Sequence, residues 1–325
     1  MRMLWFLVLW PVVAFGGRVA SPAVFEWNAM GTWVRLTVRG EDAESAGAVM
    51  RDAAYSALEE VESETSAFRP DSAVARVSAA AGNGEWIATG KAFDAALGLA
   101  LEVAAASGGA FNPLVAPLME ANGFARRPPG TEEAVAAAPS ATLLELTKIE
   151  RRPGACRLAS AGMALDLGGV AKGLGADRAA SAARAAAQND FLLDIGGNLV
   201  GRGEWTVGIR DPRAPADAPP LRTFTLANGM AVATSGNYER CAERPDGTTV
   251  GHLFDPRTGQ PAEGGVLQAT AIAPTAAEAD AWSTALFVLG PDEGRAVLSG
   301  RDAPGALWVV AAAPDGIRIV TFPAP

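Results

Sequence analysis

The stretch that most constrains the fold is residues 164–178, ALDLGGVAKGLGADR. A short apolar segment ends at Leu167, a glycine pair follows, and an alanine-rich segment typical of a helix continues to about Ala187. The pattern predicts a strand, a tight glycine turn and a helix start, with Asp166 at the strand's end and Lys172 in the first helical turn. Such a turn suits an anion, because backbone N–H groups and the helix dipole point at it.

The turn matches neither of two common phosphate-binding motifs. The order G-x-x-x-x-G-K-[ST] is absent, and Gly173, Gly175 and Arg178 break the spacing of G-x-G-x-x-G. These residues alone leave two alternatives open, a site for an anion or nucleotide and a tight turn with a solvated lysine.

Length and charge narrow the class of protein. The chain has 325 residues, 49% of them apolar, which suffices for one large domain or two closely joined ones. A net charge of −9 argues against nucleic acid or an anionic membrane surface as the main partner. An anionic ligand would therefore need local cations or a bound metal.

Residues 1–23 have the pattern of a targeting segment, in which Arg2 precedes an apolar core at 3–15 and small residues follow. The core is too short for a comfortable transmembrane helix. We therefore expect an exported soluble protein, with an uncleaved N-terminal anchor as the alternative.

Two cysteines, Cys156 and Cys241, form no C-x-x-C motif and no metal quartet. They could pair in an oxidising compartment, but two unpaired thiols are the expectation.

Hydrophobic periodicity predicts more strands than regular strand–helix–strand units, which favours an α+β fold with largely antiparallel sheets flanked by helices. A rigid apolar loop at 108–119 is of the kind that lines pockets, and a surface excursion with a short helix is predicted at 126–141. The expected helices lie at 42–65, 89–107 and 275–289, and the expected strands at 24–38 (a pair or one bent strand), 191–200, 205–209, 221–226, 230–240, 267–273, 308–312 and 317–322.

The last predicted helix carries a candidate metal site. Thr275 and Glu278 form a capping box, and Asp280 and Thr284 stand four residues apart on one face. Mg²⁺ prefers one or two carboxylates, neutral oxygens and substrate phosphates, and a carbonyl of the 168–169 glycine pair could complete the set. In the alternative, Thr284 bonds back to its own helix and Asp280 faces solvent.

His252 is the only histidine, the two cysteines lie far apart in dissimilar settings and no H-E-x-x-H motif is present, which argues against a zinc site. A general base or a donor to a phosphate is the candidate role of His252. A histidine that only satisfies a backbone carbonyl is the alternative. Ser235 follows Thr234 without a G-x-S-x-G elbow, which argues against a serine hydrolase. These hydroxyls and Tyr238 fit contacts to a ring or ribose better.

Seven motifs in this order resemble the ApbE family of FAD:protein FMN transferases, over nearly all of the chain after the leader. They are 30–32 (MGT), 110–113 (AFNP), 166–173 (DLGGVAKG), 195–197 (IGG), 233–236 with 238–240 (ATSG, YER), 252–259 (HLFDPRTG) and 279–284 (ADAWST).

The resemblance implies an ApbE-like domain at residues 24–325, with FAD in a cleft between two subdomains. It implies Mg²⁺ on the Gly169 carbonyl, Asp280 and Thr284, and a proton acceptor at His252 or Asp280, of which we favour His252. The implied FAD contacts, together with the ring or ribose contact expected of Tyr238, are Met30, Ala110, Phe111, Asn112, Asp166, Lys172, Tyr238 and Phe254.

Family members transfer the FMN half of FAD to a Thr or Ser hydroxyl of a target protein and release AMP. Their targets are exported or membrane-bound electron-transfer subunits, which agrees with a leader and implies the periplasm or the periplasmic face of the inner membrane. A Mg²⁺-dependent FAD pyrophosphatase and a non-catalytic FAD carrier remain alternatives. Two departures from the family pattern are Asn112, where an acid is common, and Cys241, where a bulky aromatic is common.

Overall fold

The structure is a computed structural model that describes residues 21–124, 144–215, 217–238, 241–243, 249–262, 264–299, 305–314 and 316–323. The excursion predicted at 126–141 and residues 1–20 of the predicted leader lie outside these ranges. Among the described helices, none combines the length and apolar composition that crossing a bilayer requires.

An eight-stranded sheet forms the centre of the described fold, and all its neighbouring strands pair antiparallel. This confirms the predicted α+β class. In spatial order the strands are β1 (Ala23–Ala29), β2 (Thr32–Val38), β6 (Phe191–Ile195), β7 (Asn198–Arg202), β10 (Ala231–Gly236), β15 (Val266–Ala273), β16 (Gly305–Ala312) and β17 (Gly316–Phe322).

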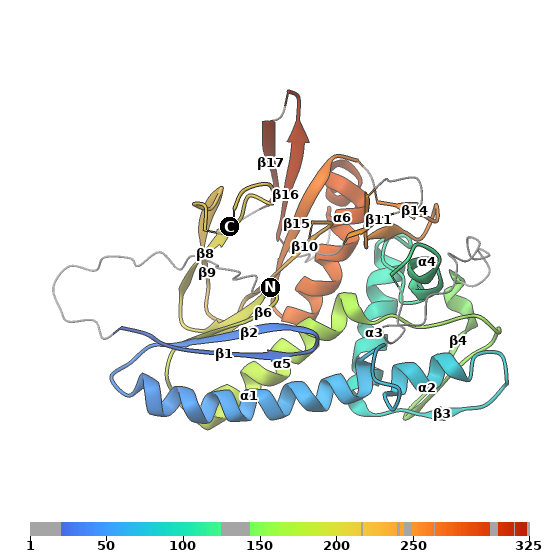
Figure 1. Ribbon diagram of the computed structural model, residues 1–325, viewed down its shortest axis with the longest axis horizontal. Coiled ribbons are helices and arrows are strands. Elements are labelled where there is room, and N and C mark those ends of the chain that lie inside the picture. The colour runs from blue at the N-terminus through green and yellow to red at the C-terminus, as the bar shows by residue number, and fades with distance from the viewer. Residues whose placement is uncertain are drawn as a thin grey trace.

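Helices cover one face of the large sheet, and Figure 1 shows α1 and α5 lying against one another below the β1–β2 hairpin. The α-helices of the described ranges are α1 (Ala43–Thr65), α2 (Ala73–Ala79), α3 (Lys91–Ala106), α4 (Ala116–Ala121), α5 (Gly168–Ala186) and α6 (Ala276–Leu298), and a 3₁₀ turn spans Leu146–Lys148.

The opposite face is covered by the hairpin of β8 (Trp205–Ile209) and β9 (Arg222–Leu226). Strand β6 has apolar side chains on both faces of the sheet. Phe191, Leu193 and Ile195 pack in the cluster beneath α1 and α5, whereas Leu192 packs in the cluster of β8 and β9. Because side chains alternate along a strand, a strand covered on both faces needs apolar side chains on each of them. Asp194, the exception in β6, accepts from the Gly197 N–H at 2.9 Å.

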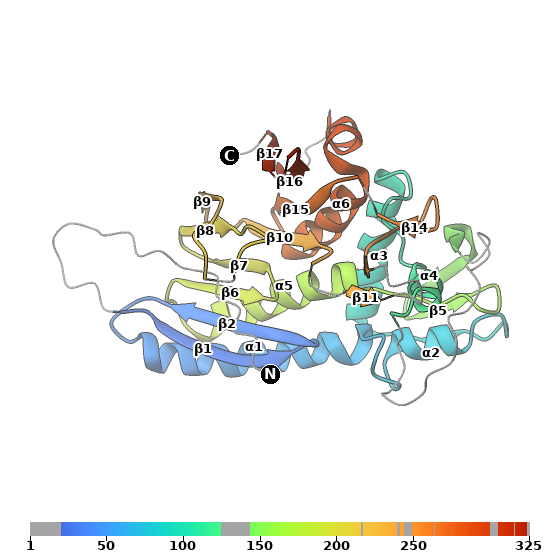
Figure 2. The ribbon, with the colours of Figure 1, turned by 45° about the horizontal axis from the view of Figure 1, so that its top comes forward.

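A smaller region of helices and short strands lies beside the large sheet, on the side where α6 packs (Figure 2). One apolar cluster joins the two regions, since Phe93 and Leu97 of α3 belong to the same cluster as Trp308 of β16. The short sheets are β3 (Ile87–Ala88) with β5 (Ala155–Leu158) and β4 (Ile149–Arg152), β11 (Cys241–Glu243) with β12 (Thr249–Gly251), and β13 (Phe254–Asp255) with β14 (Gln260–Pro261).

The predicted strand before the glycine pair is wrong. Residues 163–167 join no sheet, although Met163, Leu165 and Leu167 are buried. The N–H of Leu165 donates to Ser78 Oγ of α2 at 3.0 Å, and the N–H of Asp166 donates to the Pro113 carbonyl at 2.7 Å. The alternating pattern therefore reflects one buried face of a segment whose backbone N–H groups bond to a helix and a loop rather than to a neighbouring strand.

The predicted strand at 24–38 is a hairpin whose turn is Met30 and Gly31. Both residues have left-handed φ values, 52° for Met30 and 69° for Gly31, which a tight two-residue hairpin turn requires. The Met30 N–H donates to Glu62 Oε2 at 3.0 Å, which ties this turn to the end of α1.

Helix α6 begins as predicted, because Thr275 Oγ1 accepts from the Glu278 N–H at 3.2 Å. It continues past the predicted end at residue 289, to Leu298, across a break at Gly290, whose φ is 67°, and Pro291. Asp177 of α5 provides a second cap: its two carboxylate oxygens accept from the N–H groups of Ala276 (2.8 Å) and Ala277 (3.0 Å). Burial raises the pKa of Asp177, an effect that these two donors oppose.

Asp177→Ala leaves two N–H groups at the start of α6 without an acceptor. We expect the free energy of unfolding to fall by about 3 kcal/mol, since each such donor costs about 1–3 kcal/mol. Urea denaturation at pH 7 measures the change. Asp52→Ala, which removes an exposed ion pair with Arg51 on α1, is the control and should change stability by less than about 0.5 kcal/mol. Equal stabilities of the two variants would contradict the capping role.

The two cysteines are not paired: Cys156 is buried in β5 and Cys241 is exposed in β11. Burial raises the pKa of the Cys156 thiol to about 12. At pH 8 its thiolate fraction is therefore on the order of 10⁻⁴. We expect a thiol reagent to label one cysteine of the native protein quickly and the second only after denaturation, as mass spectrometry of labelled peptides can follow. Fast native labelling of a Cys241→Ser variant would contradict this.

Candidate active site

A pocket of about 930 Å³ brings together every residue that the sequence analysis proposed for the site. This volume is at the upper end for small-molecule sites and suits a ligand as large as a dinucleotide. The predicted residues that line it are Met30, Ala110, Phe111, Asn112, Asp166, Gly169, Lys172, Tyr238, His252, Phe254, Asp280 and Thr284.

Turns at one end of the large sheet form part of the wall. The β1–β2 turn at Met30 and Gly31 and the β6–β7 turn at Gly196 and Gly197 both line the pocket. The loop and helix at 110–124 contribute the smaller region's part of the wall. The cleft therefore lies between the sheet and the smaller region, as the sequence analysis expected, although the two regions share a core.

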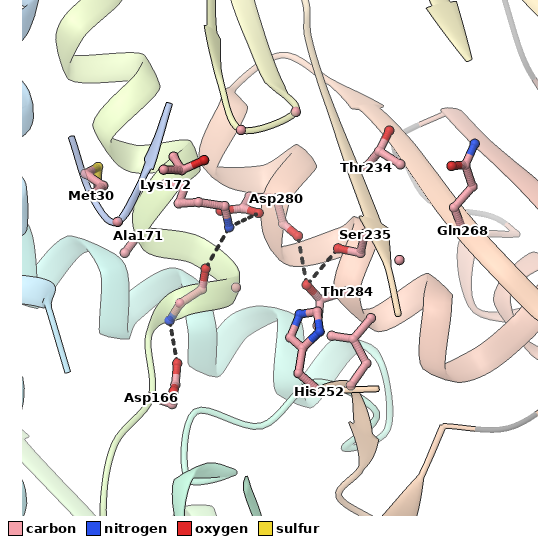
Figure 3. Close-up of a pocket in the computed structure, with 18 of the residues that line it drawn as sticks. Met30, Asp166, Ala171, Lys172, Thr234, Ser235, His252, Gln268, Asp280 and Thr284 are labelled. Carbon is pink, nitrogen blue, oxygen red and sulfur yellow. Dashed lines mark hydrogen bonds and ion pairs between the residues drawn. The ribbon is translucent and has the colours of Figure 1, made fainter. Parts of the chain in front are cut away.

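Lys172 and Asp280 meet inside the pocket, 108 residues apart in sequence. Lys172 Nζ lies 3.4 Å from Asp280 Oδ1 and donates to the Gly168 carbonyl at 3.0 Å (Figure 3). The Asp280 side chain is only 5% exposed, and its Oδ2 accepts from the Gly173 N–H at 2.9 Å. The alternative in which Asp280 faces solvent is therefore excluded.

Thr284 lies one turn beyond Asp280 on α6 and close to the α5 glycine pair. A Cβ placed on Gly169 would be 3.0 Å from the Phe111 ring and 3.2 Å from Thr284 Oγ1, so the glycine lets this backbone lie beside the hydroxyl without crowding. Thr284 also makes the predicted bond back to its helix, donating to the Asp280 carbonyl at 3.3 Å. A bond of this direction involves the hydroxyl proton and leaves the oxygen lone pairs available.

This donor set fits Mg²⁺. Within the described residues no group of three or more His, Cys, Asp or Glu side chains gathers, which argues against a site made of protein ligands alone. One carboxylate, one hydroxyl and a backbone carbonyl leave positions for water and substrate phosphates, which is the usual way that proteins hold Mg²⁺.

The start of α5 differs from the predicted anion site. Helix α5 begins at Gly168, so Lys172 opens its second turn rather than standing in the first. Asp166 Oδ1 accepts from the Gly168 N–H at 2.7 Å, and the N–H groups of Val170 and Ala171 bond to the Leu167 carbonyl. The Asp166 carboxylate therefore occupies the position at the start of α5 where the helix dipole would attract a phosphate. Lys172, whose Nζ donates to the Gly168 carbonyl, is then the group at this turn that could attract an anion.

Asn112 is already hydrogen-bonded within the protein. Its Nδ2 donates to the Leu144 carbonyl at 2.9 Å, and its Oδ1 accepts from the Leu114 N–H at 2.8 Å. The amide thus closes the 110–114 loop, and its neighbours Ala110 and Phe111 are buried beside it. The predicted FAD contact of Asn112 remains a prediction, to which its side chain brings no charge.

His252 lies half-buried at the pocket wall, and Figure 3 shows its ring pointing toward Thr284. Phe124 packs against His252, with ring centroids 6.4 Å apart, and edge-on against Phe254 at 5.9 Å. The N–H of Leu253 donates to Asn237 Oδ1 at 2.9 Å, which ties this segment to the end of β10. The imidazole is therefore held at the wall of the same pocket that Thr284 lines.

Several residues that line the pocket were not predicted from the sequence, because they belong to no recognisable local motif. Phe68, 63% exposed in the loop after α1, places an aromatic ring at the pocket's edge, and Phe124 supports His252. On the far side, Gln268 accepts from Tyr238 OH at 3.3 Å and donates to the Arg210 carbonyl at 2.9 Å. Of these, only the exposed aromatic in a polar loop could have been noticed from sequence.

The pocket's own charge differs from that of the chain. Three carboxylates and three cationic side chains line it, so its formal charge is near zero although the chain carries −9. A dianionic ligand therefore meets less repulsion here than elsewhere on the surface. The six residues are Glu62, Asp166, Asp280, Arg69, Lys172 and Arg210.

Comparison with known proteins gives one consistent result. A family model described as "ApbE family" matches residues 30–308. The FAD:protein FMN transferase of Treponema pallidum is 36% identical over 77% of this chain and 74% of its own length. The FAD:protein FMN transferase of Klebsiella pneumoniae is 32% identical over 92% of this chain and 88% of its own length.

Solved structures agree with these sequence matches. The flavinyl transferase ApbE of Pseudomonas stutzeri superposes with a TM-score of 0.77 at 26% identity, covering 93% of this chain and 95% of the other. The ApbE protein of Thermotoga maritima superposes with a TM-score of 0.78, also at 26% identity. With the sequence match running through every wall of the pocket, the chain belongs to the ApbE family.

Proposed function

We propose that this chain is an FAD:protein FMN transferase that uses Mg²⁺, attaches FMN to a Thr or Ser hydroxyl of a target protein and releases AMP. The observation that carries the proposal is the meeting of Asp280, Thr284, Gly169 and Lys172 at one point of a pocket large enough for a dinucleotide. The flavin transfer is inferred from the relatives, which are named FAD:protein FMN transferases, and Mg²⁺ is inferred from the oxygen ligands that the site offers.

The proposed reaction exchanges one bond to phosphorus for another. The acceptor oxygen attacks the phosphorus of the FMN half, the bond from that phosphorus to the oxygen shared with AMP breaks, and AMP leaves with that oxygen. The proton of the acceptor hydroxyl would pass to His252, which lines the same pocket as Thr284, with Asp280 as the alternative acceptor. Asp280, Thr284 and Gly169 would hold Mg²⁺, which supplies charge neutralisation at the diphosphate. Lys172 would neutralise charge developing on the leaving AMP phosphate.

The remaining walls would bind the two nucleotide halves. Met30, the 110–112 segment, Asp166, Tyr238 and Phe254 offer backbone groups, a carboxylate and ring faces to the substrate. Edge-on packing against Phe124 orients the Phe254 ring, so its orientation does not have to be set on binding.

One incubation tests the proposal against its rivals. The protein is mixed with FAD, Mg²⁺ and an exported flavoprotein subunit, and the acceptor mass and free AMP are measured. We expect the acceptor to gain the mass of FMN with one AMP released per acceptor. AMP with an unmodified acceptor would identify a pyrophosphatase instead, and bound but intact FAD would identify a carrier. EDTA should stop the transfer.

We further propose that the chain works outside the cytoplasm, on an electron-transfer subunit there, because of the targeting pattern at residues 1–23. Cell fractionation of the full chain tests this. Recovery with the periplasmic or inner-membrane fraction is expected, and recovery with the cytoplasm would contradict it.

A further inference from the structure

Three hydroxyl groups from β10 and α6 form a short chain beside the proposed metal site. Ser235 Oγ on β10 lies 2.7 Å from Ser283 Oγ. It also lies 3.2 Å from Thr284 Oγ1 (Figure 3). Ser283 is fully buried and Ser235 is half-buried at the pocket wall. Neither serine has a role in the reaction described above, and the ring or ribose contact expected of Ser235 does not account for these bonds.

Proton counting sets the direction of every bond in this chain. Ser283 Oγ donates its single proton to the Asp280 carbonyl at 2.8 Å, and a carbonyl can only accept. Ser235 must therefore donate to Ser283, which uses its own single proton. Toward Thr284, Ser235 can then only accept.

The consequence falls on the proton of Thr284. Its two neighbours, Ser235 Oγ at 3.2 Å and the Asp280 carbonyl at 3.3 Å, can both only accept, so they compete for its single proton. Whichever oxygen takes the proton, it points toward the protein, and the lone pairs are left for the pocket. A neutral hydroxyl binds a cation only through a lone pair, and a proton aimed at the cation would repel it.

We propose that Ser235 and Ser283 are positioning residues that hold the Thr284 hydroxyl in the orientation required to bind the divalent ion. The inference rests on the proposed function, because it assigns the ion to Thr284 and Asp280. Both ends of the arrangement lead to Asp280: its carbonyl ends the hydroxyl chain, and its carboxylate is held by the Gly173 N–H. Outer partners of metal ligands act by fixing ligand orientation in this way.

The test measures metal binding directly. Free Mn²⁺ is followed by electron paramagnetic resonance while it is titrated into full-length protein with FAD and no acceptor. We expect Ser235→Ala and Ser283→Ala each to weaken Mn²⁺ binding about tenfold, the lower bound for losing an outer partner of a metal ligand. The double variant should lose little more than either single variant, because either change breaks the same chain.

Ser299→Ala is the matched control, since Ser299 Oγ makes the same type of bond, to the Arg295 carbonyl on the same helix, with no link to Thr284. It should bind Mn²⁺ as the wild type does. Thermal unfolding without metal identifies any variant that is simply destabilised. Wild-type Mn²⁺ affinity in both serine variants, or losses that add in the double variant, would overturn the proposal.

The two levels of inference fail in different ways. If the wild type itself binds no Mn²⁺ in the presence of FAD, the proposed function fails. If Asp280→Asn loses Mn²⁺ while both serine variants keep it, the metal site stands and only the positioning role fails.

Discussion

Asp280→Asn should release no AMP from FAD above background under conditions where the wild type turns over. Asparagine keeps an oxygen that can accept from the Gly173 N–H, so the contact between α5 and α6 survives. It replaces Oδ1, the oxygen beside Lys172 Nζ, with an uncharged NH₂ group that cannot bind a cation. We expect a loss of about 10³-fold or more in AMP release, since the metal and its charge neutralisation are removed together. Chromatography of the nucleotides measures it.

The asparagine variant separates chemistry from folding better than alanine does. Asp280→Ala would leave the buried Gly173 N–H without an acceptor, at a cost of about 1–3 kcal/mol, and lost activity could then reflect unfolding. A normal thermal unfolding curve for Asp280→Asn is the control. Wild-type AMP release from that folded variant would refute the metal assignment.

Lys172→Met should lower AMP release and raise the affinity of the nucleotide-free protein for a divalent ion. The ammonium lies 3.4 Å from Asp280 Oδ1, the carboxylate oxygen that the Gly173 N–H leaves available. It therefore competes with a metal ion for that oxygen until a phosphate arrives to bind it. Removing the ammonium ends this competition, but it also removes a positive charge from the leaving AMP phosphate. We expect AMP release to fall by about 10²-fold.

These opposite signs distinguish a functional lysine from a structural one. Mn²⁺ titration without FAD measures the gain in affinity, and AMP release with saturating Mg²⁺ measures the loss. Lys148→Met removes a surface lysine that pairs with Glu145, and it should change neither quantity. A Lys172→Met variant with weaker Mn²⁺ binding and normal AMP release would contradict both parts of the argument.

The sequence predicts best where local interactions decide. The start of α6 could be identified because Thr275 caps a backbone N–H only three residues away. The hairpin of β16 and β17 and the helix α1 follow from hydrophobic periodicity, which one buried face imposes on neighbouring residues. All the predicted site residues line one pocket because they belong to motifs whose order the chain shares with a known family.

Predictions failed where a distant partner decides. Residues 163–167 have the alternation of a strand, but their N–H groups bond to Ser78 and Pro113, so no sheet forms. The first helical segment of α6 ends at the break at Gly290, close to the predicted end, but the second segment was not predicted; it packs on β16, where a Cβ on Gly294 would lie 2.6 Å from the Trp308 ring. Neither outcome is encoded within a single segment.

Residue types and spacing determined the fold class, most of the elements and the pairing of Asp280 with Thr284, and the resemblance to a known family implied the candidate substrate contacts. Tertiary structure alone decided how those residues are arranged: Asp280 is buried against Gly173, Lys172 holds its free oxygen, and Ser235 orients Thr284. The physical reason is range. Helix caps and hydrophobic periodicity act within a few residues. The ion pair of Lys172 with Asp280 and the hydrogen bond of Ser235 with Thr284 instead join groups 108 and 49 residues apart, which meet only when α5, α6 and β10 pack together.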